Sequence, residues 1–295
     1  ALSSGVTTEW QVTTDNSIGT SCSYLYDLKR FPVLGDDSTT SIDYGNQGLT
    51  GTLPTEFGLL TKVSQFKVQS NSFSGAIPSE LGNLVNIVNQ FNLATSGFSS
   101  AIPSELGQLV DLTNDMYMSG NSLSDPIPTQ LGNWVKLTAY FRLESNKLTS
   151  AIPTELGKLA NIGQNFWLES NKLTSAIPTE LGGLGEMTEN FQLNGQNGAN
   201  TFSSLPTELG SLTKMATGFQ IEHGAIVSSS IPTEMGRLSG LGESFRLGMN
   251  DFALSPIPSE LGQLVSLSRT FYIFDNGLSS TIPTQLGNLV NMTYD

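Results

Sequence analysis

Apolar and polar residues repeat along this chain with a period of about 25 residues. In one unit Phe141 and Leu143 alternate with Arg142 and Glu144, the two-residue period of a half-buried strand. An Ile-Pro-Thr-Glu-Leu-Gly segment follows and predicts a short helical turn, with Thr154 as a candidate cap. A fixed period of this length predicts a solenoid, because no single unit buries its own apolar face.

The same frame fits about ten units, and each contributes two inward strand positions. These pairs are Ile42/Tyr44, Phe66/Val68, Phe91/Leu93, Met116/Met118, Phe141/Leu143, Phe166/Leu168, Phe191/Leu193, Phe219/Ile221, Phe245/Leu247 and Phe271/Ile273. Stacked units of this kind predict one parallel sheet.

The repeat divides the chain into two parts. Residues 1–40 carry no repeat, and we interpret them as an N-terminal capping segment over the first coil. Its aromatic residues are Trp10, Tyr24, Tyr26 and Phe31. Residues 41–295 form the predicted array of about ten coils, and the sequence indicates no C-terminal cap.

An asparagine recurs just after the predicted strands. Its side chain can both donate and accept hydrogen bonds, so a stacked column can satisfy backbone groups inside sharply turning coils. The column comprises Asn71, Asn121, Asn146, Asn171, Asn250 and Asn276, and Gln47, Ser96 and Gly224 interrupt it. We interpret this column as structural.

These motifs together resemble the plant-type leucine-rich repeat, L-x-x-L-x-L-x-x-N-x-L-x-G-x-I-P-x-x-L-G-x-L, and residues 66–84 match its second half. The resemblance implies an α/β solenoid, a right-handed superhelix with a parallel sheet on its concave face. Short helical or 3-10 turns would line the convex face. It also implies an extracellular protein, as in plant receptor ectodomains and algal secreted proteins.

This chain departs from that pattern in three ways. Most coils carry one extra residue before the strand. The glycine before Ile-Pro is kept as Gly51 and Gly75 but becomes serine in later coils, as Ser100, Ser150, Ser175 and Ser280. The cap holds a single cysteine, Cys22, in place of the paired cysteines common in plant repeats. Cys22 is therefore either buried and inert or paired with another chain.

Charge excludes several partners. A formal net charge of −13 argues against nucleic acid and against anionic lipid, both of which attract cationic surfaces. No apolar run is long enough to span a membrane, so the sequence predicts no membrane insertion. A glycosylation triplet at Asn291 is weak support for a secreted or cell-surface glycoprotein.

Catalysis is poorly supported. The only histidine, His223, and the only cysteine have no evident partners, so the sequence predicts no enzyme, no cofactor and no metal. A column of acids deserves comparison with a calcium site: Glu56, Glu80, Glu105, Glu155, Glu180, Glu208, Glu234 and Glu260. We favour the simpler interpretation, in which each acid stabilises the start of a short helix.

The concave face is the predicted binding surface, since large aromatic side chains and arginine dominate interface energetics. Its candidate ligand-binding residues are Lys67, Tyr117, Tyr140, Arg142, Glu144, Trp167, Glu169, Glu222, Arg246 and Tyr272, with Phe274 beside them. We expect a recognition module that binds a protein or glycan through this face.

Two alternatives stay open. The first is a structural or adhesive protein whose coils self-associate in a matrix or filament. The second is an ice-binding protein that uses serine and threonine rows on one flank. These rows include Ser99-Ser100, Thr149-Ser150, Thr174-Ser175, Ser203-Ser204, Ser228-Ser229-Ser230 and Ser279-Ser280.

Overall fold

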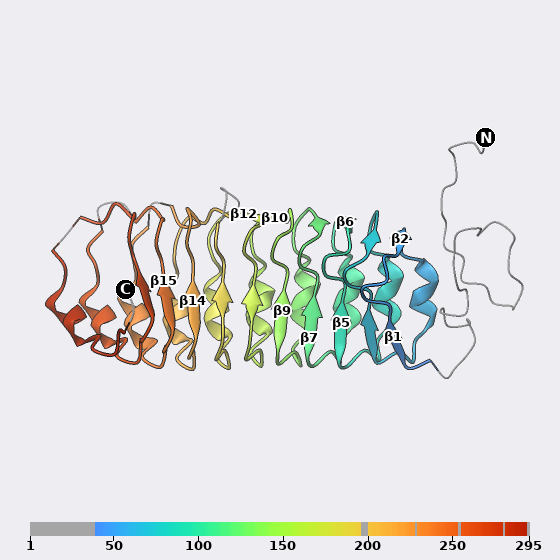
Figure 1. Cartoon of the computed structure of the whole chain (residues 1–295), viewed down its shortest axis with the longest axis horizontal. Helices are drawn as coiled ribbons and strands as arrows, with labels where there is room; N and C mark the ends of the chain where they lie inside the picture. The colour runs from blue at the N-terminus through green and yellow to red at the C-terminus, as the bar shows by residue number, and fades with distance from the viewer. Residues whose placement is uncertain (1–38, 196–199, 228, 253–254, 280, 294–295) are drawn as a thin grey trace, which may run out of the picture.

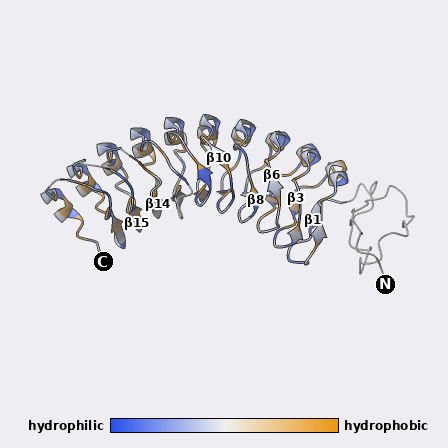
Figure 2. Cartoon of the chain, turned by 90° about the horizontal axis from the view of Figure 1, so that it is seen from above, coloured by the Kyte–Doolittle hydropathy of each residue, from blue (hydrophilic) through white to orange (hydrophobic). Residues whose placement is uncertain are grey.

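Each repeat unit forms one coil, and the coils stack into an arc (Figures 1 and 2). The structure is a computed structural model that describes residues 39–195, 200–227, 229–252, 255–279 and 281–293. The predicted N-terminal cap, including Cys22, lies outside the described residues apart from its last two positions. The predicted solenoid is confirmed.

The inner side of the arc is one parallel sheet of ten strands, which Figure 2 shows along the concave edge. The strands are β1 (Ser41–Asp43), β3 (Gln65–Lys67), β5 (Gln90–Asn92), β7 (Asp115–Tyr117), β9 (Tyr140–Arg142), β11 (Phe166–Trp167), β13 (Phe191–Gln192), β14 (Gly218–Gln220), β15 (Ser244–Arg246) and β16 (Thr270–Tyr272). The register is one coil per step, so Phe141 lies opposite Phe166 and Arg142 opposite Trp167.

The outer side carries a five-residue 3-10 helix in each coil. These are η2 (Thr55–Leu59), η3 (Ser79–Asn83), η4 (Ser104–Gln108), η5 (Thr129–Asn133), η6 (Thr154–Lys158), η7 (Thr179–Gly183), η9 (Thr207–Ser211), η10 (Thr233–Arg237), η11 (Ser259–Gln263) and η12 (Thr284–Asn288). The expectation that Thr154 caps its helix is wrong, because Pro153 occupies the N-cap position without a side-chain bond. The Thr154 hydroxyl instead donates to Glu155 Oε2 at 3.3 Å.

The glycine of the Leu-Gly motif is required by coil stacking. A Cβ atom added to Gly157 would lie 2.2 Å from the backbone oxygen of Glu180 on the next coil. Real Cβ contacts are never that short, so any other residue would push the two coils apart. The repeat therefore keeps glycine where 3-10 helices touch.

Inside the coils, apolar side chains form one continuous core. From Phe141 to Phe271 the first inward strand position is an unbroken stack of phenylalanine rings. The centroids lie 5.2 Å apart between Phe141 and Phe166 and 5.5 Å apart between Phe166 and Phe191. The asparagine column lies beside this stack. Asn146 and Asn171 donate to backbone oxygens of their own coil and of the preceding one. These bonds give the asparagine column the structural role that the sequence predicts.

Two irregular positions still take part in that column. The Ser96 hydroxyl donates to the Val68 oxygen at 2.8 Å, so serine substitutes for asparagine there. In the coil that contains residues 194–201, Asn200 donates to the Leu168 oxygen at 2.9 Å and accepts from the Leu173 amide at 3.0 Å. The sequence frame misses Asn200, because the longer turn displaces it from the repeat position.

The flank that joins strand to helix holds short strands in separate pairs. They are β2 (Thr50–Gly51) with β4 (Ser72–Phe73), β6 (Ser99–Ser100) with β8 (Ser122–Leu123), and β10 (Thr149–Ser150) with β12 (Lys172–Leu173). Ser100, Ser150 and Ser175 keep the left-handed backbone of the glycine they replace, with φ of 69°, 66° and 75°. Among the described residues, no helix has the length and hydropathy that crossing a membrane requires.

Candidate functional site on the concave face

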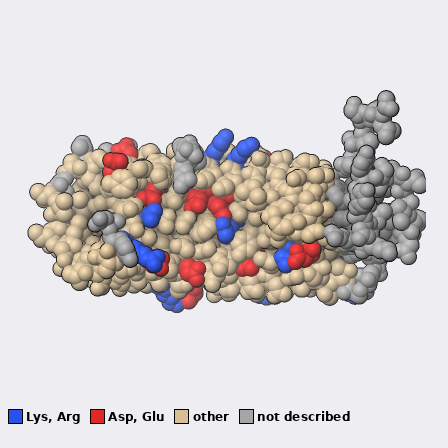
Figure 3. Space-filling model, viewed as in Figure 1, with Lys and Arg blue, Asp and Glu red and all other residues tan. Residues whose placement is uncertain are grey.

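The structure places the predicted binding residues in rows along the solvent side of the large sheet. Lys67, Tyr117, Arg142, Trp167, Arg246 and Tyr272 are the last residues of their strands, and Tyr140 is the first residue of β9. Glu144, Glu169 and Glu222 follow two residues after their strands end. Figure 3 shows that charged atoms form only a few small groups on a face that is otherwise uncharged.

Six of these residues lie together on three adjacent coils, and we call them the central patch: Tyr117, Tyr140, Arg142, Glu144, Trp167 and Glu169. The Tyr117 and Tyr140 rings stack with centroids 5.6 Å apart. The Arg142 guanidinium carbon lies 4.0 Å from the Trp167 ring centroid and 5.6 Å from that of Tyr117. The cation therefore lies between two aromatic rings and makes cation–π interactions with both, and partial burial strengthens these interactions.

The acids of the central patch outnumber its cation. Arg142 Nε donates to Glu144 Oε1 at 2.9 Å, and Nη2 donates to the same oxygen. Glu169 lies on the next coil, close enough to interact electrostatically with both Arg142 and Glu144. Its pKa is raised to about 7, first by burial and then by the charge of Glu144, while Arg142 opposes the rise.

Three buried polar side-chain atoms of the central patch lack a hydrogen-bond partner. They are Glu144 Oε2, Glu169 Oε2 and Trp167 Nε1, and the described residues hold only two others, Gln69 Oε1 and Arg246 Nε. Buried polar groups are normally paired, so a concentration of unpaired ones calls for an explanation. Glu144 is the clearest case, because only 6% of the residue is exposed.

Sequence reasoning missed one neighbour of the central patch. Asp115 lies opposite Tyr140 in the register of β7 and β9 and accepts a hydrogen bond from Gln90 Nε2 at 3.3 Å. Burial raises the pKa of its carboxyl. The two-residue period of β7 puts Asp115 on the same face as Tyr117, and that signal was present in the sequence.

The remaining candidates lie elsewhere on the sheet. Arg246 Nη1 lies 3.9 Å from Glu222 Oε2, and its guanidinium carbon lies 5.0 Å from the Tyr272 ring centroid. Burial raises the pKa of Glu222, against the effects of Arg246, His223 and a backbone hydrogen bond. Lys67 forms an ion pair with Asp43 on the neighbouring strand. The structure therefore divides the ten predicted residues among three places.

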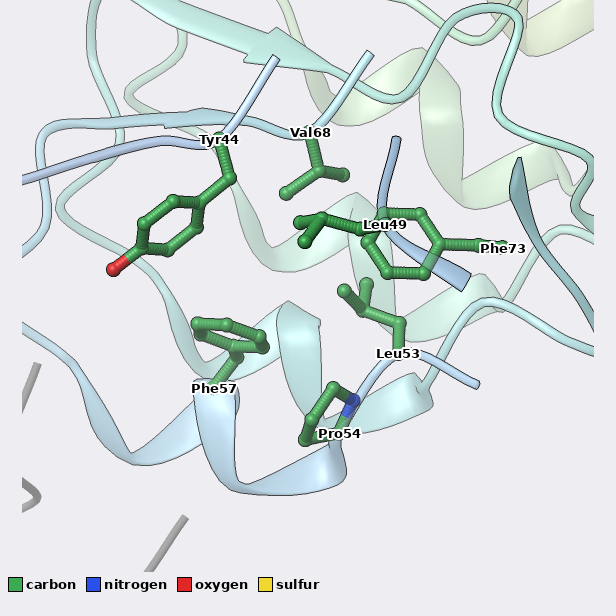
Figure 4. A pocket seen from close by; sticks show the side chains of 7 residues that line it. All are labelled: Tyr44, Leu49, Leu53, Pro54, Phe57, Val68 and Phe73. Atoms are coloured by element: carbon green, nitrogen blue, oxygen red, sulfur yellow. The ribbon is translucent and has the colours of Figure 1, made fainter. Parts of the chain in front are cut away.

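Other candidate sites offer less chemistry. An apolar hollow of about 210 Å³, partly open solvent, is lined by Tyr44, Leu49, Leu53, Pro54, Phe57, Val68 and Phe73 (Figure 4). Six of these seven side chains carry no polar atom, whereas small-molecule sites combine apolar walls with convergent polar groups. Among the described residues, no three side chains suited to metal binding come together.

Solved structures with this architecture include the leucine-rich-repeat regions of plant receptor kinases. The ectodomain of the Arabidopsis thaliana membrane receptor kinase GASSHO1/SCHENGEN3, solved with CASPARIAN STRIP INTEGRITY FACTOR 2, is 30% identical, with a TM-score of 0.71 over 88% of this chain and 32% of that chain. The Arabidopsis receptor kinase HAESA, solved with the peptide hormone IDA and the co-receptor SERK1, is 25% identical, with a TM-score of 0.67 over 95% and 48%. This chain is a plant-type leucine-rich-repeat protein.

The leucine-rich-repeat chain spans about a third of the first receptor structure and about half of the second. A plant ice-binding protein is also similar, at 24% identity and a TM-score of 0.62 over 82% of this chain and 74% of that chain. At that identity the likeness shows the fold alone. No protein-family model matches the leucine-rich-repeat chain, and no curated protein does.

Proposed function

We propose that this leucine-rich-repeat protein is an extracellular recognition module that binds a segment of a protein partner through the central patch. The observation that carries the proposal is the arrangement of Arg142 between Trp167 and Tyr117, with unpaired polar atoms beside it. Tryptophan, tyrosine and arginine are the residue types that most often dominate binding energy. The receptor kinase HAESA, which has this architecture, has been solved with the peptide hormone IDA, which supports the same class of partner here.

The concave face also suits an extended ligand better than the flank does. Its ten strands form one continuous sheet, so a peptide lying across them can contact several coils in succession. On the flank, backbone hydrogen bonds also link successive coils, for example from the Ser124 amide to the Ser100 oxygen at 2.9 Å and from the Thr149 amide to the Asp125 oxygen at 3.1 Å. The serine and threonine rows there nonetheless lack the strict Thr-x-Thr regularity on which the ice-binding hypothesis depends.

Selection from a random peptide library displayed on phage tests this proposal. We expect enriched peptides to bind the wild-type protein and to lose about tenfold or more in affinity with Trp167→Ala or Tyr117→Ala. Lys158→Ala, an exposed change on the convex helix η6, is the matched control and should bind like wild type.

Two results would overturn the proposal. One is a library that yields no peptide with measurable affinity, and the other is a set of peptides that bind all variants equally. A glycan array probed with the same variants tests the other predicted class of partner, a glycan. Glycan binding that depends on Trp167, without peptide binding, would refute a protein partner.

A further inference from the structure

The unpaired atoms of the central patch indicate the chemistry of the group it binds. We propose that Glu144 and Glu169 together receive a basic side chain of the ligand, whose N–H groups donate to Glu144 Oε2 and Glu169 Oε2. The Trp167 indole N–H then donates to an adjacent carbonyl oxygen of the same ligand. This inference rests on the proposed function and specifies its partner as a peptide segment with an arginine or lysine.

The first step concerns Glu144. Its Oε1 accepts both hydrogen bonds from Arg142, which leaves Oε2 buried and unpaired. Only 6% of this residue is exposed, so the unpaired oxygen lacks water as a partner and its desolvation costs free energy. A carboxylate oxygen only accepts hydrogen bonds, so its missing partner must be a donor.

The second step concerns charge. Arg142 supplies one positive charge, whereas Glu144 and Glu169 supply two negative charges when both are ionised. The raised pKa of Glu169 is the response expected of a second carboxyl without its own cation. A bound cation would restore neutrality and would replace the proton that Glu169 otherwise retains near neutral pH.

The third step concerns Trp167. Its indole Nε1 is also buried and unpaired, and an indole N–H can only donate. A bare metal ion offers no acceptor to this group, and a simple anion would be repelled by the two carboxylates. A basic residue within a peptide offers both a cationic donor and a backbone carbonyl acceptor.

The C-terminal end of the sheet lacks this arrangement. Arg246 lies beside a single acid, Glu222 on the preceding coil. Gly248 and Phe274 occupy the positions on its own coil and on the next coil that correspond to Glu144 and Glu169. The charges there balance one to one. The inference therefore applies to the central patch and not to every arginine on the concave face.

Two small probes that differ in charge but hardly in shape provide the test. They are N-acetyl-arginine N-methylamide and its neutral analogue N-acetyl-citrulline N-methylamide. Binding is followed through the ¹⁵N-labelled indole resonance of Trp167, which Trp167→Phe assigns among the three tryptophans of the chain. We expect the arginine probe to shift this resonance saturably and the citrulline probe to leave it in place at the same concentrations.

Variants locate the cation. Glu169→Gln keeps the shape of the side chain and removes its charge, so we expect about a tenfold loss of affinity for the arginine probe. Glu180→Gln, on the exposed helix η7 of the same coil, should leave the affinity unchanged. Equal shifts by both probes, or full affinity in Glu169→Gln, would overturn the inference.

Calcium chloride alone is the third probe. A saturable shift of the Trp167 resonance by calcium that excludes the arginine probe would refute a basic side chain in favour of a metal ion. The outcomes also separate this inference from the proposed function. Library peptides that need Trp167 but carry no basic residue would keep the function and refute the inference, whereas the absence of any binding peptide would refute the function.

Discussion

The asparagine column and the central patch both place polar side chains where water is largely excluded, yet they differ in how they are satisfied. Asn171 is fully buried, accepts from the Leu148 amide at 3.1 Å, and donates to the Leu143 and Leu168 oxygens at 3.0 and 3.1 Å. Glu144 is nearly as buried, but one of its oxygens has no partner.

The difference separates polar groups that the fold requires from those that it merely tolerates. Each asparagine bonds to its own coil and to the preceding coil, so the stack satisfies it without help from outside. The central patch occurs once, and its charges and hydrogen bonds do not balance within the protein. Variants in the column should therefore change stability, and variants in the patch should change binding more than stability.

The largest effect is expected at the column. Asn171→Ala removes one accepted and three donated hydrogen bonds. It leaves the Leu148 amide unpaired, whereas the Leu143 and Leu168 oxygens still accept from Asn146 and Asn200. We expect the free energy of unfolding to fall by about 3 kcal/mol, since one unpaired amide costs about 1–3 kcal/mol, each lost hydrogen bond adds about 0.5–1.5 kcal/mol, and the effects are not fully additive. Urea unfolding followed by circular dichroism measures it.

Asn161→Ala is the control for that prediction. Asn161 lies on the preceding coil, between η6 and β11, and donates one exposed hydrogen bond to the Val135 oxygen at 2.8 Å. Its loss should cost less than about 1 kcal/mol. Similar losses for Asn161→Ala and Asn171→Ala would contradict the special role of the column.

The next effect concerns the part of the central patch that is already paired. Arg142→Met leaves the buried charge of Glu144 without a counter-ion, so we expect a loss of about 2 kcal/mol in the free energy of unfolding at pH 8. The double variant Arg142→Met/Glu144→Gln should recover most of that loss, because the uncompensated charge is gone. A double variant no more stable than Arg142→Met would show that Arg142 acts through its packing on Trp167 and Tyr117 instead.

Most of the fold could be predicted from the sequence, because residues at the same position of successive repeats lie opposite each other on neighbouring strands. Residues one repeat apart, such as Arg142 and Trp167, must become neighbours on the sheet, and the structure pairs them. The inward alternation of Phe141 and Leu143 likewise fixes the core. Local rules did less well: Thr154 was expected to cap η6, but Pro153 sets the backbone there and the hydroxyl bonds to Glu155.

The sequence could predict which residues belong to the candidate site, but not how they pair or how deeply each is buried. Periodicity assigns Glu144 and Glu169 to one row, yet it cannot tell which carboxylate Arg142 pairs with or how deeply each is buried. Those properties depend on side-chain packing among three coils. The position of Asn200 was unpredictable for a related reason, since an insertion breaks the frame that identified the other asparagines.

The central patch should also make the stability of the protein depend on pH. The pKa of Glu169 is raised to about 7 in the folded protein from an ordinary value of 4.5, so the folded state holds a proton that the unfolded state has released between those values. The free energy of unfolding should therefore fall as pH rises from 4.5 to 7. Allowing for partial solvent exposure, the loss is on the order of 1 kcal/mol.

Glu169→Gln removes the ionisable group and should flatten this part of the stability profile. At pH 8 we expect the variant to be more stable than wild type, while at pH 4.5 the two should be alike. Glu180→Gln, exposed on the convex side, should keep the wild-type dependence between pH 4.5 and 7. Unfolding in urea at several pH values measures it, and a profile unchanged by Glu169→Gln would refute the assignment.

The smallest effect lies in the structural flank, where Ser150 adopts a φ of 66° and the equivalent Gly51 and Gly75 adopt 90° and 80°. A left-handed backbone costs a non-glycine residue about 1–2 kcal/mol, and the greater chain entropy of glycine offsets part of the gain. Ser150→Gly should therefore raise the free energy of unfolding by about 0.5 kcal/mol. Ser122→Gly, in β8 without a positive φ, should lower it by about the same amount.

Neither change should alter binding of the arginine probe, because both positions belong to the stacked coils and not to the central patch. A change in binding without a change in stability would reverse the assignment of the two regions.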